Sequence, residues 1–198
     1  MLALVLGLIV FMGVHSIRIV SDDFRTRQIE RIGMGTWRGM YAALSLVGFV
    51  LIVVGYGVAR TVPYVIWYPP VWTAHVAMLL TIPAFILIAS SFVPGTRIRK
   101  KLGHPMVLGI KIWAFAHLLA NGMLADILLF GTFLVWSIAA YASGRRRDRK
   151  AGTVYPVGPV YRDIIAVVAG LAAWLVFAMW LHVMLIGVSP MRMAVAGG

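Results

Sequence analysis

Residues 41–58 read YAALSLVGFVLIVVGYGV, an apolar run without a single charged side chain. Because an α-helix rises about 1.5 Å per residue, a run of this length nearly crosses the hydrocarbon core of a bilayer, which is about 30 Å thick. A membrane-spanning strand would instead alternate polar and apolar residues along its length. The run therefore predicts a membrane-spanning helix.

Five further stretches have the same apolar character, and they cover residues 2–17, 72–92, 104–120, 124–142 and 164–188. Backbone N–H and C=O groups must find partners inside the segment in lipid, so each stretch is expected to be a helix. The first stretch lacks the basic start and small-residue cleavage site of a signal peptide, and we expect it to stay in the protein. The sequence predicts an all-α polytopic membrane protein, a bundle of six transmembrane helices forming one domain over residues 1–198.

The composition excludes several classes of protein. Of the 198 residues, 62% are hydrophobic and 12% are charged, whereas a soluble domain has about 25% charged residues. An ordinary cytosolic enzyme and a disordered chain are both excluded. The chain has no cysteine. Disulfides, thiolate nucleophiles, iron–sulfur ligation and covalent c-type haem attachment are therefore excluded as well.

Basic residues are concentrated in the connections after the first, third and fifth stretches. These fifteen are Arg18, Arg25, Arg27, Arg31, Arg38, Arg97, Arg99, Lys100, Lys101, Arg145, Arg146, Arg147, Arg149, Lys150 and Arg162. Positive connections face the cytoplasm, so both termini are predicted to be periplasmic. The net charge of +12 is interpreted as topology and attraction to anionic lipids, strongest over residues 145–150, rather than as nucleic-acid binding.

Ionisable residues within the apolar stretches are the candidates for function, because charge is costly inside a bilayer. His104 and Lys111 share one face of the helix predicted over 104–120, and His117 points about 120–140° away from them. An undistorted helix therefore cannot direct both histidines at one metal. His104 precedes Pro105 at a helix start, where it either anchors the helix or acts as a ligand.

The other candidates differ in their depth in the bilayer. His75 and His182 are predicted near an interface, where water can satisfy an imidazole. Lys111 either extends its ammonium to the headgroups or holds an acidic cofactor group such as a propionate. His117 is predicted beyond the midplane, where it requires a partner or a metal. Imidazole is the plentiful ligand type, and paired imidazoles in a helical bundle suit haem.

The chain lacks a phosphate-binding loop, an H-E-x-x-H motif and a nucleophile elbow. The chain has six acidic residues in all, and this small number argues against a carboxylate-based hydrolytic site or a two-metal site. Asp126 follows the tight turn at residues 121–122, and it is expected to cap the helix that begins there.

Two stretches carry a family resemblance. The first reads GVHSIR at residues 13–18, followed by RIG at 31–33 and WRGMYAALSL at 37–46, and the second reads HPMVLGIKIWAFAHLLANG at 104–122. They resemble the NnrU family of bacterial inner-membrane proteins. The resemblance is strongest over residues 1–136, and residues 164–188 provide an additional span.

The resemblance implies a multi-pass protein of the bacterial inner membrane associated with nitrite and nitric oxide reduction in denitrification. The same fold family includes the 15-cis-ζ-carotene isomerase of plants and cyanobacteria, which uses haem b. The histidines of its HS and W-x-x-A-H motifs correspond to His15 and His117, so the resemblance implies that these two bind haem iron. Ala114 replaces a cysteine of the isomerase, and Gly103 replaces an arginine. These differences weaken the transfer of isomerase activity more than that of haem binding.

Depth constrains how the two histidines could share a haem. His15 and His117 are predicted to lie about 10 Å apart along the membrane normal. A haem that both bind would therefore lie closer to the membrane plane than to the normal.

Three functions remain open from the sequence. The first is a haem b protein that supports nitrite and nitric oxide metabolism. The second is a non-catalytic accessory or scaffold subunit of a larger membrane complex or reductase, since the small residues Ala166, Gly170 and Ala173 allow close helix approach. The third is a haem-dependent cis/trans isomerase of a carotenoid-like polyene. We rank these three functions in the order given.

Overall fold

The structure is a computed structural model, and it describes residues 1–190. Within this range the fold is helical. The helices are α1 (Leu2–Val20), α2 (Asp22–Ile32), α3 (Met34–Thr61), α4 (Val71–Ser90), α5 (Arg97–Leu102), α6 (Pro105–Ala120), α7 (Leu124–Ala151), α8 (Tyr161–Val176), the π-helix η1 (Phe177–Leu181) and α9 (His182–Ile186).

Five of these helical segments are long and apolar enough to cross a membrane: α1, α3, α4, α7 and the continuous stretch Tyr161–Ile186. The helix α6 is apolar but has only 16 residues, which gives it a length of about 24 Å. The predicted helical membrane fold is confirmed with five candidate spans. The helix expected over residues 104–120 is present and shorter than the others.

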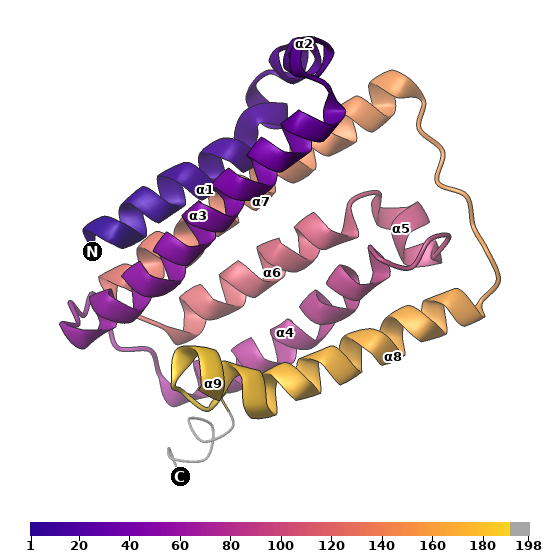
Figure 1. The fold of residues 1–198 in the computed structure, drawn as a ribbon. Helices are drawn as coiled ribbons and strands as arrows, with labels where there is room; N and C mark the ends of the chain where they lie inside the picture. The colour runs from indigo at the N-terminus through magenta and orange to yellow at the C-terminus, as the bar shows by residue number, and fades with distance from the viewer. Residues whose placement is uncertain (191–198) are drawn as a thin grey trace.

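The helices pack in two groups of three. In the first group α1 packs on α3 and α7, and in the second group α4 packs on α6 and α8. The contact between α6 and α7 joins the groups (Figure 1). A core of buried side chains in the first group consists of Leu4, Leu8, Ile52, Ala59, Ala125, Leu129 and Phe130.

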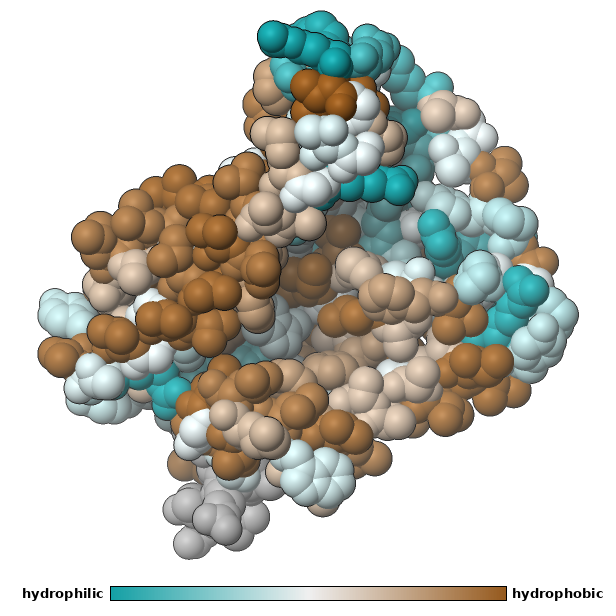
Figure 2. All heavy atoms as spheres, in the orientation of Figure 1, coloured by the Kyte–Doolittle hydropathy of each residue, from teal (hydrophilic) through white to brown (hydrophobic). Residues whose placement is uncertain are grey.

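Polar connections gather at one end of the bundle, where Figure 1 shows α2, α5 and the connection from α7 to α8. We call it the basic end, because it holds the arginines and lysines of these three connections. Figure 2 shows polar residues at this end and apolar residues over the helix sides below it. Many large apolar side chains are exposed there, among them Ile9, Leu46 and Leu79. This surface suits lipid rather than water.

Small residues let the backbones of neighbouring helices approach. A Cβ added at Gly48 of α3 would lie 2.7 Å from the backbone nitrogen of Phe11, and one at Gly7 would lie 2.6 Å from that of Ile52. In the second group, Ala166 is fully buried and a Cβ at Gly170 would lie 2.5 Å from the Ile86 Cα. Ala166 and Gly170 of α8 are therefore already used for packing within the chain, whereas Ala173, the third small residue of this helix, is exposed.

Local sequence signals explain the breaks at the basic end. The side chain of Ser21 accepts a hydrogen bond from the Phe24 N–H and caps α2, and Asp22 and Asp23 lie in the first turn. Gly33, with φ +82°, turns the chain directly into α3. The chain thus folds α2 back over the end of α1, which places Trp37 and Arg38 of α3 beside His15.

Candidate functional site

His15 lies one and a half turns before the end of α1. Its Nδ1 lies 2.7 Å from the backbone carbonyl oxygen of Phe11, four residues earlier in the same helix. A carbonyl only accepts, so Nδ1 carries the hydrogen, and in the neutral ring Nε2 keeps a free lone pair. The imidazole stacks on the Phe11 ring at 4.1 Å and contacts the rings of Tyr41 and Trp136.

His117 of α6 has the same local arrangement. Its Nδ1 lies 2.8 Å from the backbone carbonyl oxygen of Trp113, again four residues earlier. The imidazole stacks on Phe130 of α7, with ring centres 4.5 Å apart, and contacts the Trp113 ring at 5.0 Å. Metal-binding histidines are commonly oriented by a hydrogen bond from the nitrogen that does not face the metal. Both imidazoles meet this condition.

A series of aromatic rings connects the two histidines. The ring centre of Phe133 in α7 lies 6.0 Å from that of Phe11, the ring beside His15. It lies 5.6 Å from that of Trp113, the ring beside His117. The ring contacts of His15 and those of His117 involve different partners. The structure therefore brings both imidazoles onto one aromatic cluster formed by α1, α6 and α7, and within the described residues the two imidazoles have no ring contact with each other.

Lys111, the third candidate residue, is half-buried in α6. Its ammonium group makes no hydrogen bond or ion pair with another residue of the part of the chain that the structure describes. It lies about 9 Å from His117 along the helix axis. An interior ammonium group without an acidic neighbour is a favourable position for an anionic group of a ligand.

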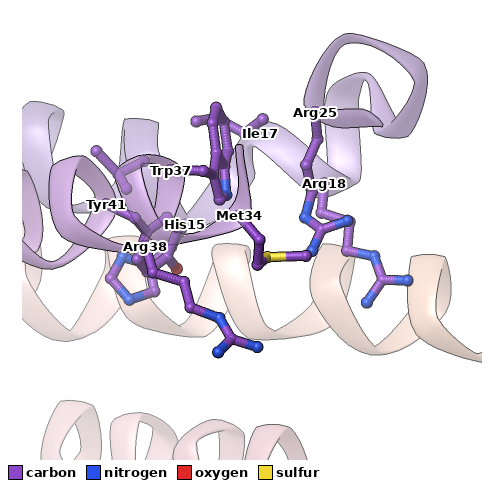
Figure 3. A pocket seen from close by; sticks show the side chains of 9 residues that line it. His15, Ile17, Arg18, Arg25, Met34, Trp37, Arg38 and Tyr41 are labelled. Carbon is purple, nitrogen blue, oxygen red and sulfur yellow. The ribbon is translucent and has the colours of Figure 1, made fainter. Parts of the chain in front are cut away.

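An open cleft of about 310 Å³ lies beside His15 at the basic end (Figure 3). It is lined by Val14, His15, Ile17, Arg18, Arg25, Met34, Trp37, Arg38 and Tyr41. From the sequence, its arginines are interpreted as determinants of topology and of attraction to anionic lipids, and they are not grouped with His15. The signal that would have grouped them is the short Gly33 connection, which folds α2 and α3 back onto the end of α1.

The remaining histidines lie elsewhere. The Nε2 of His104 is 3.0 Å from the Asp148 carboxylate of α7, and His104 packs against Gly144, where a Cβ would lie 2.6 Å from that Nε2. The Nδ1 of His182 is 2.7 Å from the backbone carbonyl oxygen of Val188. His75 is exposed in the second turn of α4. His104 therefore anchors α6 to α7, and it lies apart from His117 as their rotation about the helix predicts.

Asp126 caps α7 as predicted and is 1% exposed. Its carboxylate accepts hydrogen bonds from the Met123 backbone N–H at 3.0 Å and from the Tyr56 hydroxyl at 2.6 Å. Both carboxylate oxygens thus have partners, which is how a buried acid is tolerated. Within residues 1–190, no three His, Asp or Glu residues are grouped closely enough to hold a metal ion.

Comparison with known proteins gives one result. No curated protein and no solved structure matches the chain. The sequence model of one family, described as NnrU protein, matches residues 3–190, so the match includes both histidine helices and continues through α8 and α9. Since this match covers nearly the whole chain, the protein belongs to the NnrU family.

Proposed function

We propose that this protein binds haem b in the bacterial inner membrane through His15 and His117 and supports nitrite and nitric oxide metabolism. In this proposal α6 is the sixth span, the basic end faces the cytoplasm and both termini face the periplasm. The observation that carries the haem assignment is the arrangement shared by the two histidines. Each is tied through Nδ1 to its own helix and keeps Nε2 free.

The residues fit haem in their chemistry. Two neutral imidazoles would be suitable ligands for the iron, and Lys111 would supply a positive charge for a propionate. Haem would supply an iron centre that binds nitric oxide or carries an electron. His15 is stacked on Phe11, and His117 is stacked on Phe130. Binding of one iron by both imidazoles requires the contacts among Phe11, Phe133 and Trp113 to rearrange.

Optical and electron paramagnetic resonance spectra of the purified protein with added haem b test this proposal. We expect the wild type to retain haem with a low-spin spectrum, because two imidazoles give a strong ligand field. We expect His15→Ala and His117→Ala to lose haem or to convert it to a high-spin form. His75→Ala is the matched control, since it removes an exposed imidazole from α4, and its spectrum should equal the wild-type spectrum.

Two further measurements separate ligation from folding. In His15→Gly and His117→Gly, added imidazole should restore the low-spin spectrum, which a misfolded variant would not show. Nitric oxide added to the reduced protein should shift the Soret band. Failure of the wild type to retain haem contradicts the haem assignment. If only one of the two histidine variants changes the spectrum, joint ligation by both is wrong.

A further inference from the structure

The cleft beside His15 is built by three helices that meet at the basic end. Arg18 comes from α1, Arg25 from α2 and Arg38 from α3. Figure 3 shows Arg18 and Arg25 extending in the same direction, with Arg38 on the other side of Met34. Three guanidinium groups on three separate helices thus line one cavity.

These charges are incompletely balanced. Arg18 pairs with Asp22 at 3.2 Å, and both side chains of this pair are substantially exposed. Arg25 and Arg38 have no ion pair with any acidic residue in the described range, and the cleft lining contains no acidic side chain. Because like charges gathered in one cavity repel, an anion placed among them lowers the electrostatic energy.

The rest of the lining is apolar or aromatic. Ile17, Met34 and Trp37 contribute apolar surface, and Tyr41 adds a ring that contacts His15. Trp and Tyr typically lie at the level of the lipid headgroups. The apolar sides of α1 and α3 continue from the cleft toward the middle of the bundle (Figure 2). A cavity with cationic and apolar walls at this level suits an anion with an attached hydrocarbon chain.

We propose that this cleft binds the headgroup phosphate of one anionic phospholipid, with Arg25 and Arg38 as the phosphate-binding residues. Guanidinium groups form charge-assisted, often bidentate hydrogen bonds to phosphate. Trp37 and Met34 lie where the glycerol and upper acyl chain would pass. The site is more specific than the general attraction of basic connections to an anionic membrane, because its residues come from three helices.

Binding of phosphatidylglycerol to the full chain in a neutral detergent tests the proposal, measured by native mass spectrometry during titration. We expect one tightly bound lipid per wild-type chain. Because each of these two arginines would lose its charge-assisted hydrogen bonds to the phosphate, R25Q/R38Q should weaken binding about 30-fold, or about 2 kcal/mol. The matched control R27Q/R31Q removes the same charge from α2 outside the cleft, and it should weaken binding about threefold or less.

Three outcomes would overturn the proposal. Equal losses in R25Q/R38Q and R27Q/R31Q would show that only net charge matters. Equal affinity of the wild type for phosphatidylcholine would remove the requirement for an anionic lipid. Displacement of the lipid by millimolar inorganic phosphate would identify a site for free phosphate. R25K/R38K keeps both charges without the bidentate geometry, so it should bind more tightly than R25Q/R38Q and more weakly than the wild type, which a general loss of folding would not produce.

Discussion

At the scale of single residues, one glycine connects helix packing to the candidate site. Gly48 of α3 lies against Phe11 of α1, and the carbonyl of Phe11 holds the Nδ1 of His15. Close helix approach in a membrane depends on small residues, because apolar side chains gain little by leaving lipid. The position of His15 thus depends on a residue that never touches it.

Gly48→Ala should separate α1 from α3. The added Cβ would lie 2.7 Å from the Phe11 nitrogen and 2.9 Å from its Cβ, so the helices must shift. We expect a loss of about 1–3 kcal/mol in the free energy of unfolding, measured by denaturant titration with tryptophan fluorescence. Gly57→Ala on the same helix meets no atom within 4 Å, and it should be neutral or stabilising by up to about 1 kcal/mol. Equal effects of the two variants would contradict this account.

At the scale of elements, Asp148 connects three segments at the basic end. Its carboxylate accepts from the Tyr155 hydroxyl at 3.0 Å and lies 3.0 Å from the His104 Nε2, so α7 holds the start of α6 and the connection to α8. Burial raises the pKa of Tyr155, and the Asp148 carboxylate raises it further. The neutral phenol of Tyr155 is the hydrogen-bond donor, so this contact is intact at any pH below the ordinary tyrosine pKa. It is lost as the pH rises through the raised pKa of Tyr155 in the folded protein.

Asp148→Asn should loosen the connection from α7 to α8. A hydrogen bond to a charged group contributes about 1.5–3 kcal/mol, and its loss favours local opening of this segment. We expect trypsin to cleave Asp148→Asn after Arg149 or Lys150 at least about ten times faster than it cleaves the wild type. Gel electrophoresis of samples taken over time measures the cleavage rate. Asp23→Asn, at an exposed position of α2, should leave the cleavage rate unchanged. A wild-type rate for Asp148→Asn would show that the segment is held by other contacts.

The sequence predicts the long helices well because each is an uninterrupted apolar run. It misplaces their ends: α3 begins at Met34 rather than 41, and α7 continues to Ala151 rather than 142. Arginine and lysine are good helix formers, so a helix can continue after the chain has left the bilayer. The helix α7 ends only at Gly152, which adopts the left-handed conformation. The short α2 and α5 lack an apolar run and were not predicted.

The sequence identifies His15, Lys111 and His117 as the unusual interior residues, but it does not determine their neighbours. Helical rotation predicts that His104 and His117 lie apart, since this depends on one helix alone. The aromatic cluster through Phe133 depends on how three helices pack. The periodicity of a sequence does not show how separate helices pack, so it could not show whether His15 and His117 come into contact. Their joint ligation of iron stays a prediction.

At the scale of the whole molecule, the proposed orientation is open to direct test because the chain has no cysteine. Single cysteines can therefore be introduced without removing others. Tyr68 is 84% exposed in the connection between α3 and α4, opposite the basic end, and Thr153 is exposed at the basic end. A membrane-impermeant maleimide added to intact spheroplasts should label Tyr68→Cys and not Thr153→Cys. The reverse pattern would contradict a cytoplasmic basic end.

The short α6 gives the molecule two hydrophobic lengths. Its 16 residues make about 24 Å of helix, beside neighbours α4 and α7 of 20 and 28 residues. The Ile66 N–H donates to the Gly122 carbonyl at one end, and the Tyr141 hydroxyl donates to the Leu102 carbonyl at the other. The hydrocarbon core of a bilayer has one thickness, which can match only one of these two helix lengths. In the proposed six-span arrangement, hydrophobic mismatch is thus built into the fold, and lipid thickness acts on the helix that carries His117.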